Sequence, residues 1–242
     1  MELSHRVIVV TGASSGIGRA TAVLLGERGA KVVLASRDAG KLRALEAQIA
    51  GSLAIPTDME DFAQIGALFA QAEAKFGRID GLINNAGRAY ESTVERVDPA
   101  AFEKIFRLNV LAPVIAIQQV VPALRRAGGG AIVNIGSGTA QMAIPGYSVY
   151  SSSKRALVGV SLTARAELAS EKISVSMVHP RLTATDFGSN KVRTEADNGI
   201  PGGRMGADYS KGDSPEHVAG VIAQALIEGG PEYFAHESMA RR

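Results

Sequence analysis

The chain contains no cysteine, so it has neither a disulfide framework nor thiol chemistry. Its four histidines are scattered along the sequence without the spacing of metal ligands, and no metal site is predicted. An excess of one charge is also missing, because 26 basic and 24 acidic residues give a formal net charge of +2. This balance indicates neither nucleic acid nor an anionic membrane as a partner.

Long hydrophobic runs are absent as well. The longest apolar stretch, residues 110–121, contains Pro113 and two glutamines, and we expect it to be too short and too polar to span a bilayer. A secretory leader is not expected, because a strand-like run at residues 6–10 begins almost at the first residue. Together with the lack of cysteine, this favours a cytoplasmic protein without a membrane partner.

What the sequence does have is an alternation of strand and helix patterns, with 46% hydrophobic residues among 242. That is enough for one large α/β domain over residues 1–242. Short apolar runs rich in Val and Ile predict buried strands at 7–10, 31–35, 52–56, 79–83, 131–135 and 173–178, and a final edge strand at 232–235. Helical patterns lie at 16–28, 40–50, 61–76, 99–126, 149–170 and 215–227. The alternation predicts a doubly wound, mainly parallel sheet of about seven strands with helices on both faces.

One segment, residues 183–213, does not follow this alternation. It is polar and glycine-rich and has no clear period. A stretch of this length inside a compact domain is usually functional. The alternative is a surface insertion without a role.

A glycine-rich turn joins the first predicted strand to the first helix. Gly12, Gly16 and Gly18 are spaced so that backbone amides can approach a pyrophosphate at the helix N-terminus. Their G-x-x-x-G-x-G spacing differs from the more general dinucleotide fingerprint and shares only its mechanism. An ordinary βα turn is the alternative, although its position between strand and helix favours a nucleotide site.

Tyr150 and Lys154 are four residues apart in a predicted helix, so both side chains project from one face. A nearby ammonium lowers the pKa of a phenol from about 10, which makes tyrosine a usable general acid and base. Ser137 follows the strand at 131–135 and is expected at the carboxyl edge of the sheet, where open α/β folds bind ligands. Its hydroxyl can donate to a substrate oxygen.

Together and in this order, the glycine turn, the run Asn84 to Gly87, Ser137, Tyr150 and Lys154 resemble the short-chain dehydrogenase/reductase family in its short single-domain branch. The resemblance extends from Val7 to about Leu226. It implies a Rossmann-type fold, an NAD(P) cofactor, and hydride transfer between the nicotinamide and a carbonyl or secondary alcohol. It also implies that the segment 183–213 is a substrate lid.

The resemblance assigns catalysis to Tyr150 and Lys154 with Ser137 and Asn109. Asn109 matches the family's helix-bending asparagine, which would hold a water that links Lys154 to solvent; a locally satisfied polar group within the helix is the alternative. The implied substrate contacts are Ser137, Thr139, Gln141, Met142, Tyr147, Tyr150 and Phe187. The implied cofactor contacts are Gly12, Ser14, Ser15, Gly16, Ile17, Gly18, Ser36, Arg37, Asp58, Met59, Asn85, Ala86, Gly87, Tyr150, Lys154, Pro180, Thr183 and Thr185. For Asn84, bracing the sheet is as good an interpretation as ligand contact.

The end of the second strand bears on the choice between NAD and NADP. A carboxylate there would hold the ribose 2′-hydroxyl of NAD, but this chain has Ser36 followed by Arg37. A hydroxyl and a guanidinium suit a 2′-phosphate, so NADP is the predicted cofactor. The alternative is that Arg37 is a solvated loop residue, partly offset by Asp38.

Arg181 departs from the family pattern, because it stands where a glycine is usual after Pro180. Either its guanidinium turns outward and is inert, which we favour, or it reaches an anionic group on cofactor or substrate. The resemblance further implies a homo-oligomer, a dimer or tetramer, formed through the helices that include residues 110–121 and 156–164.

The sequence favours an NADP-dependent oxidoreductase acting on a small carbonyl or alcohol over two rival functions. A non-catalytic dinucleotide-binding sensor or scaffold would be favoured by loss of Tyr150 or Lys154, and both are present. A sugar-nucleotide epimerase or dehydratase needs a longer C-terminal substrate domain than this chain offers. The identity of the substrate is not encoded in any motif.

Overall fold

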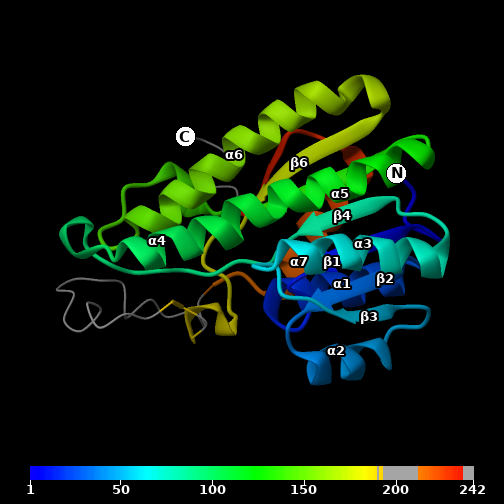
Figure 1. Cartoon of the computed structure of the whole chain (residues 1–242), viewed down its shortest axis with the longest axis horizontal. Coiled ribbons are helices and arrows are strands. Elements are labelled where there is room, and N and C mark those ends of the chain that lie inside the picture. Colours follow the sequence, from blue (N-terminus) through cyan, green and yellow to red (C-terminus); the bar gives the residue numbers. More distant parts are fainter. Residues whose placement is uncertain (190, 193–211, 237–242) are drawn as a thin grey trace.

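A seven-stranded parallel sheet forms the centre of the molecule, as the computed structural model of residues 1–189, 191–192 and 212–236 shows (Figure 1). Its strand order is β3-β2-β1-β4-β5-β6-β7, and every neighbouring pair is parallel. The predicted Rossmann-type sheet is therefore confirmed, with the last strand at the edge. The strands are β1 (Val7–Thr11), β2 (Lys31–Ser36), β3 (Leu53–Pro56), β4 (Gly81–Asn84), β5 (Gly130–Ile135), β6 (Ile173–His179) and β7 (Glu232–Phe234).

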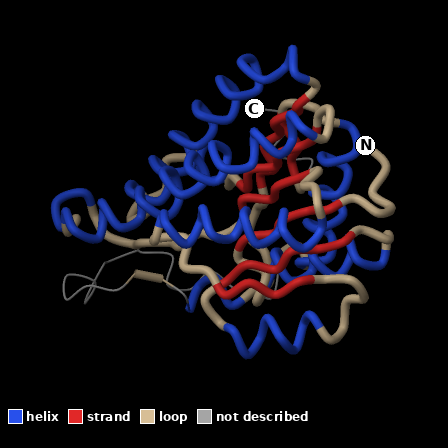
Figure 2. Tube along the Cα trace, turned by 45° about the vertical axis from the view of Figure 1, so that its right-hand side comes forward, coloured by secondary structure: helices blue, strands red, loops and turns tan. Residues whose placement is uncertain are grey.

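Helices cover both faces of the sheet, as Figure 2 shows. On β1, Val7 and Val9 face one hydrophobic cluster while Ile8 and Val10 face the other, because successive strand residues point to opposite sides. Buried on both faces, these strands read as continuous apolar runs rather than alternating ones. One face carries α1 (Gly16–Glu27), α2 (Ala39–Glu46) and α7 (Pro215–Glu228), and the other carries α3 (Phe62–Phe76), α5 (Ala112–Arg126) and α6 (Ser148–Leu168).

The helix predicted over residues 99–126 is not continuous. It divides into α4 (Pro99–Phe106), a π-helical turn η2 (Arg107–Leu111) and α5. Asn109 lies inside the π turn, so the bend expected at this asparagine is present as a widened turn. A single π turn within an α-helix is a feature often found at functional sites. The sequence pattern missed it because the apolar spacing continues across the insertion.

The same α4–η2–α5 run corrects the expectation about membrane spans. Among the described residues, Pro99–Arg126 is one helical run whose length and hydropathy would allow it to cross a bilayer. The stretch 110–121 judged too short is therefore part of a longer apolar helix. However, 56% of its most apolar window is buried inside the molecule, where it packs on α3 and the sheet. This burial is the behaviour of a core helix.

The helix and strand ends agree with the predicted ranges to within a few residues. For α7, Ser214 caps the helix by accepting a hydrogen bond from the His217 amide at 3.1 Å, and Pro215 is the first helical residue. Four short 3₁₀ turns complete the described chain: η1 (Val94–Arg96), η3 (Gly138–Gln141), η4 (Ala169–Glu171) and η5 (Asp186–Ser189).

The segment 183–213 is described only at its two ends. Thr183 and Asp213 pair as an isolated parallel bridge, which closes the base of the segment beside the end of β6. Val192 bridges Tyr90, and its amide donates to the Ala89 carbonyl at 2.9 Å. Residues 190 and 193–211 lie outside the described residues, so the substrate lid remains a prediction.

Candidate active site

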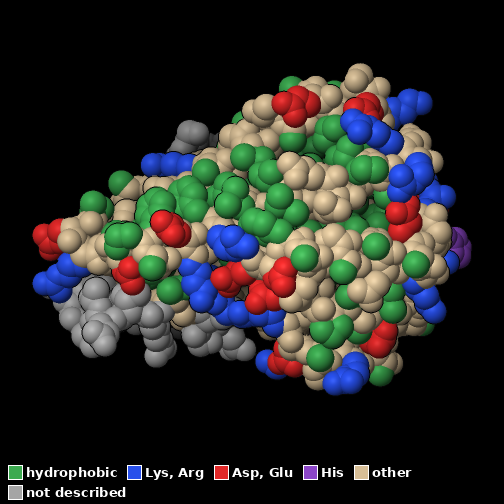
Figure 3. Space-filling view, viewed as in Figure 1, with side chains coloured by type: hydrophobic (Ala, Val, Ile, Leu, Met, Phe, Trp, Pro, Cys, Tyr) green, Lys and Arg blue, Asp and Glu red, His purple; other side chains and the backbone are tan. Residues whose placement is uncertain are grey.

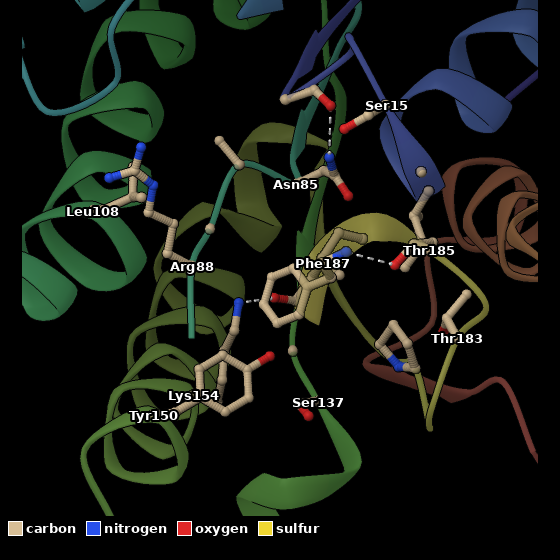
Figure 4. A pocket seen from close by; sticks show the side chains of 18 of the residues that line it. Ser15, Asn85, Arg88, Leu108, Ser137, Tyr150, Lys154, Thr183, Thr185 and Phe187 are labelled. Carbon is tan, nitrogen blue, oxygen red and sulfur yellow. Dashed lines mark hydrogen bonds between the residues drawn. The ribbon is translucent and has the colours of Figure 1, made fainter. Parts of the chain in front are cut away.

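A pocket of about 780 Å³ opens at the carboxyl edge of the sheet, where open α/β folds bind ligands (Figure 4). The loops that follow β1 to β6 all contribute to its wall. All but two of the predicted site residues line it, so the structure brings together positions far apart in the sequence. The exceptions are Gly18 and Asn109, which lie behind the wall.

The glycine turn after β1 is closely packed from behind. Gly12 has a positive φ of +67°, and a Cβ atom there would lie 2.8 Å from Nδ2 of Asn85. A Cβ on Gly18 would lie 2.2 Å from the Gly12 carbonyl oxygen, so Gly18 serves the turn rather than a ligand. Ser15 precedes α1 and makes no side-chain capping bond. The first amides of α1 are thus presented to the pocket, as a pyrophosphate site requires.

Thr11, which sequence reasoning did not single out, fixes the distance between β1 and β4 at the pocket floor. Its hydroxyl accepts from the amides of Asn85 at 3.0 Å and Ala86 at 3.1 Å. The Asn85 carboxamide donates back to the Thr11 carbonyl at 2.9 Å. The side-chain NH₂ of Asn85 is therefore committed to the floor of the site.

The alternative interpretation of Asn84 as a brace is the one the structure supports. Its carboxamide is buried and donates to Oδ1 of Asn134 on β5 at 2.8 Å. The Asn134 carboxamide in turn donates to the Ser161 hydroxyl on α6 at 2.8 Å. Asn84 does not line the pocket. This chain of bonds fixes α6, and with it Tyr150 and Lys154, against the centre of the sheet.

One end of the pocket is formed by the residues after β2 and β3. Arg37 is exposed there, next to Ser36. The carboxylate of Asp38 caps α2 by accepting from the Lys41 amide at 3.0 Å, and it lies 3.7 Å from the Lys41 ammonium. Asp38 is therefore engaged with its own helix, which reduces its expected offset of the Arg37 charge.

Tyr150 and Lys154 meet at the other end, on the buried face of α6. The Tyr150 ring is edge-on to Tyr147 at 6.2 Å and tilted against Phe187 at 5.9 Å between centroids. Nζ of Lys154 lies 5.8 Å from the Tyr150 ring centroid and donates to the Ile135 carbonyl at 2.8 Å. Burial lowers the pKa of the Lys154 ammonium to about 8.

Ser137 stands at the end of β5, on the same side of the pocket as Tyr150 and Lys154 (Figure 4). Its hydroxyl caps η3 by accepting from the Thr139 amide at 3.2 Å and also from the Thr139 hydroxyl at 3.0 Å. Both contacts use the Ser137 oxygen as acceptor. The hydroxyl hydrogen is therefore left to donate toward the pocket.

Asn109 is 1% exposed, and most of its hydrogen-bonding capacity is used. Oδ1 accepts from the Arg88 amide at 3.0 Å, while Nδ2 donates to the Arg88 carbonyl at 3.0 Å and to the Ser153 hydroxyl at 3.1 Å. One lone pair of Oδ1 has no partner in these bonds. A Cβ on Gly87 would lie 3.2 Å from Oδ1 and 3.5 Å from Nζ of Lys154, so both atoms face Gly87.

The residues after β6 close the pocket from the third side. Thr185 contributes a methyl group that would lie 3.0 Å from a Cβ on Gly16, and its hydroxyl accepts from the Phe187 amide at 3.3 Å. Arg181 is exposed, and its guanidinium lies 3.4 Å from Nε2 of His236. Arg181 also lines the pocket, so its inert role stays a prediction.

Several residues that line the pocket were not predicted from the sequence. A rule that takes every residue within two positions of a strand's carboxyl end would have found four of them, Asp38, Thr57, Ile135 and Gly136. Arg88 is the most notable, because it directly follows Gly87 and brings a charge into the site. Those not predicted are Asp38, Lys41, Thr57, Glu60, Arg88, Leu108, Ile135, Gly136, Gly138, Ile144 and Leu182. Within the described residues no group of three or more His, Asp or Glu side chains is arranged to hold a metal.

The buried Lys154 predicts a measurable cost in stability. Its pKa falls from 10.5 to about 8 on folding, a difference that corresponds to about 3 kcal/mol. Below pH 8 the side chain is charged in both states and the whole cost is present; between pH 8 and 10.5 the cost shrinks as the folded state loses the proton. Lys154→Met should therefore unfold at a higher temperature than the unmodified protein at pH 7, and the gain should vanish as the pH approaches 10.5.

Thermal unfolding followed by circular dichroism across this pH range measures the effect. Lys75→Met, on the exposed side of α3, is the matched control and should show no comparable gain. A Lys154→Met protein that is no more stable than the unmodified chain at pH 7 would show that the ammonium is well solvated.

Comparison with known proteins identifies the family. The sequence profile of the short chain dehydrogenase family matches residues 6–196. An uncharacterized oxidoreductase of Methylorubrum extorquens is 35% identical over 233 residues, which cover 92% of this chain and 90% of the relative. A short-chain dehydrogenase/reductase from Burkholderia phymatum, solved in complex with NAD, has a TM-score of 0.87 and 26% identity and covers 99% of this chain and 92% of its own.

A metagenomic short-chain oxidoreductase, solved in complex with NADP, has a TM-score of 0.78 and 30% identity, covering 97% of this chain and 98% of its own. Similar structures thus hold either cofactor, so the comparisons establish a nicotinamide dinucleotide without distinguishing NAD from NADP. The predicted resemblance and the Rossmann fold are both confirmed. The chain belongs to the short-chain dehydrogenase/reductase family of oxidoreductases, which use a nicotinamide cofactor and act on CH–OH groups.

Proposed function

We propose that this oxidoreductase uses NADP and transfers a hydride between the nicotinamide and a small ketone, aldehyde or secondary alcohol, with Tyr150 as the general acid and base. The observation that carries the proposal is the position of Tyr150 and Lys154 on one buried face of α6, inside a pocket whose other end presents Arg37.

The pocket fits such a cofactor. A Cβ on Gly12 would collide with Asn85 and Ala86 and one on Gly16 with Thr185, so the turn keeps its shape only with glycine at both positions, and the amides opening α1 are placed for a pyrophosphate. Ser14, Ser15 and Ile17 would line the pyrophosphate, Asp58 and Met59 the adenine, and Asn85, Ala86 and Gly87 the ribose. Pro180, Thr183 and Thr185 would hold the nicotinamide end. When bound, the cofactor supplies or accepts the hydride.

Tyr150 moves the proton. In the reducing direction its hydroxyl donates to the substrate oxygen, and in the oxidising direction the phenolate accepts the proton from the alcohol. Lys154 favours the phenolate by its positive charge, and a pKa of about 8 keeps that charge in place at neutral pH. Its contact with the Ile135 carbonyl fixes the ammonium close to the Tyr150 ring.

Ser137 orients the substrate by donating its hydroxyl hydrogen to the same oxygen that Tyr150 protonates. The remaining substrate wall is Thr139, Gln141, Met142, Tyr147 and Phe187, a mainly apolar set. Apolar side chains exclude water around the reacting carbon and so strengthen the electrostatic contacts within the site. This composition favours substrates with an apolar group beside the carbonyl.

Asn109 would complete the proton path. The remaining lone pair of its Oδ1 faces Gly87, where the Lys154 ammonium also points. A water bound between these two groups would connect Lys154 to solvent as the proton is consumed. The other three hydrogen bonds of Asn109 are structural, so both interpretations of this residue apply to different atoms of one side chain.

NADP preference is supported by the absence of a carboxylate at the end of β2. Ser36 is buried beside Arg37, and the nearest acid, Asp38, is held by Lys41 at the start of α2. A guanidinium free to pair with a phosphate adds charge-assisted hydrogen bonds that NAD cannot form.

Loss of turnover in Tyr150→Phe tests the assigned reaction. Removing the hydroxyl should lower kcat by roughly 10²–10⁴-fold, because proton transfer then has no positioned group, while NADPH binding changes little. NADPH oxidation with a panel of carbonyl compounds measures turnover, and fluorescence titration measures binding. Tyr233→Phe, on β7 outside the pocket, is the matched control. Activity in Tyr150→Phe close to that of the control would refute the assignment.

Cofactor preference is tested by Arg37→Asp. The unmodified protein should bind NADPH more tightly than NADH by about 1.5–3 kcal/mol, and the variant should lose or reverse that difference. Arg43→Asp makes the same charge change on α2, outside the pocket wall, and should retain the preference. Equal dissociation constants of the unmodified protein for the two cofactors would contradict the proposal.

Exposed apolar side chains on the helices that cover one face of the sheet support a homo-oligomer. Ala164 and much of the stretch 110–121 are buried within the chain, but Phe102, Leu111 and Leu162 are exposed on α4, η2 and α6. Hydrophobic side chains gather along these helices in Figure 3. We expect a dimer or tetramer by light scattering at micromolar concentration, and Leu111→Glu with Leu162→Glu should shift it toward the monomer. A monomeric mass for the unmodified protein would overturn this expectation.

A further inference from the structure

Arg88 is a charged residue of the pocket wall that the proposed reaction leaves without a role. It directly follows the Asn85 to Gly87 run at the end of β4 and lines the pocket. In Figure 4 its side chain extends away from Tyr150 and Lys154, toward Leu108. Arg88 therefore reaches toward the adenosine end of the site rather than toward the reacting end.

The backbone of Arg88 is held rigidly while its guanidinium is not. Asn109 bonds both the amide and the carbonyl of Arg88, each at 3.0 Å. By contrast, the side chain makes one long contact, 3.5 Å from its Nη1 to Oε1 of Glu60. Its Nε is buried and has no hydrogen-bond partner in the described structure. A buried donor without an acceptor costs free energy and marks a position where an acceptor is missing.

The charges around the guanidinium point to the nature of that acceptor. Burial lowers the pKa of Arg88, and the positive charge of Arg37 lowers it further, while Glu60 and Asp58 oppose this. Two guanidinium groups are thus close enough to repel each other across the pocket. An anion placed between them would remove the repulsion and give the Arg88 guanidinium a second acceptor.

We infer that Arg88 is a cofactor-binding residue that, together with Arg37, clamps the adenosine 2′-phosphate of NADP. This inference rests on the proposed NADP preference and deepens it, because it adds a second half of the phosphate site, in the loop after β4, to the half that Arg37 forms after β2. Glu60 holds the Arg88 guanidinium while the phosphate is absent and competes with the phosphate for it. The long contact of 3.5 Å is compatible with such an exchange of partners.

Two small ligands isolate the 2′-phosphate from the rest of the cofactor. Adenosine 2′,5′-bisphosphate and 5′-AMP share the adenine, the ribose and the 5′-phosphate, and differ only at the 2′-position. Isothermal titration calorimetry of both ligands should show that the unmodified protein binds the bisphosphate more tightly. Arg88→Met should weaken bisphosphate binding at least tenfold and change 5′-AMP binding less than threefold.

Three further variants test the assigned contacts. Arg88→Lys keeps the charge without the forked geometry and should give an intermediate affinity for the bisphosphate. Glu60→Gln removes the competing acceptor and should strengthen bisphosphate binding. Arg96→Met is the control for charge, since Arg96 is exposed on η1 outside the pocket wall, and it should change neither affinity. Thermal unfolding of each variant confirms that it is folded; the Asn109 contacts to Arg88 are main-chain bonds and remain in all of them.

The outcomes of these titrations distinguish the proposed Arg88 clamp from the NADP preference on which it rests. If the unmodified protein binds both ligands equally, the NADP preference and the clamp are both wrong. If Arg37→Met abolishes the discrimination while Arg88→Met retains it, the NADP preference stands and the clamp is wrong. Equal losses for both ligands in Arg88→Met would assign Arg88 to the adenine and also overturn the clamp. A bisphosphate-specific loss with a gain in Glu60→Gln supports it.

Discussion

The hydrogen bonds of the Asn109 carboxamide are the constraint on which the geometry of the site depends. Three bonds from this one side chain connect the π turn η2 to the backbone after β4 and to Ser153 on α6. The Ser153 hydroxyl continues the connection by donating to the Tyr150 carbonyl at 2.7 Å. The widened turn carries the carboxamide inward, so the irregularity in the helix is linked by hydrogen bonds to the position of Tyr150.

Burying the Lys154 ammonium in this site lowers the stability of the folded state. A buried ammonium with one carbonyl acceptor is poorly solvated, and its lowered pKa records this. The same low-dielectric surroundings make its charge effective on the neighbouring phenol. The polar network of Asn84, Asn134 and Ser161 fixes α6 on the sheet, and within the described residues Oδ1 of Asn84 is buried there without a partner.

The sheet, its helices and the site residues that belong to short sequence motifs could all be predicted from the sequence. The glycine turn, the Tyr150–Lys154 pair and Ser137 are readable because chain-local spacing already determines where they lie. The π turn at Asn109 was not readable, because its bonds to Arg88 and Ser153 join residues 21 and 44 positions apart. Thr11 was missed for the same reason: its hydroxyl serves a strand that is adjacent only in the folded sheet.

The end of the pocket formed by the residues after β2 and β3 illustrates why composition does not determine which ligand a site favours. Three cations, Arg37, Lys41 and Arg88, face three carboxylates, Asp38, Asp58 and Glu60, so the formal charges of this end cancel. Two of these carboxylates are nevertheless committed to backbone amides: Asp38 caps α2, and Asp58 accepts from the Glu60 amide at 2.9 Å. Lys41 is paired with Asp38, whereas Arg37 is exposed and Arg88 has a single long contact. An incoming anion therefore meets two arginines with unused donors rather than a neutral surface. Discrimination at this end is set by which groups already have partners, a property of the folded structure that no count of charges contains.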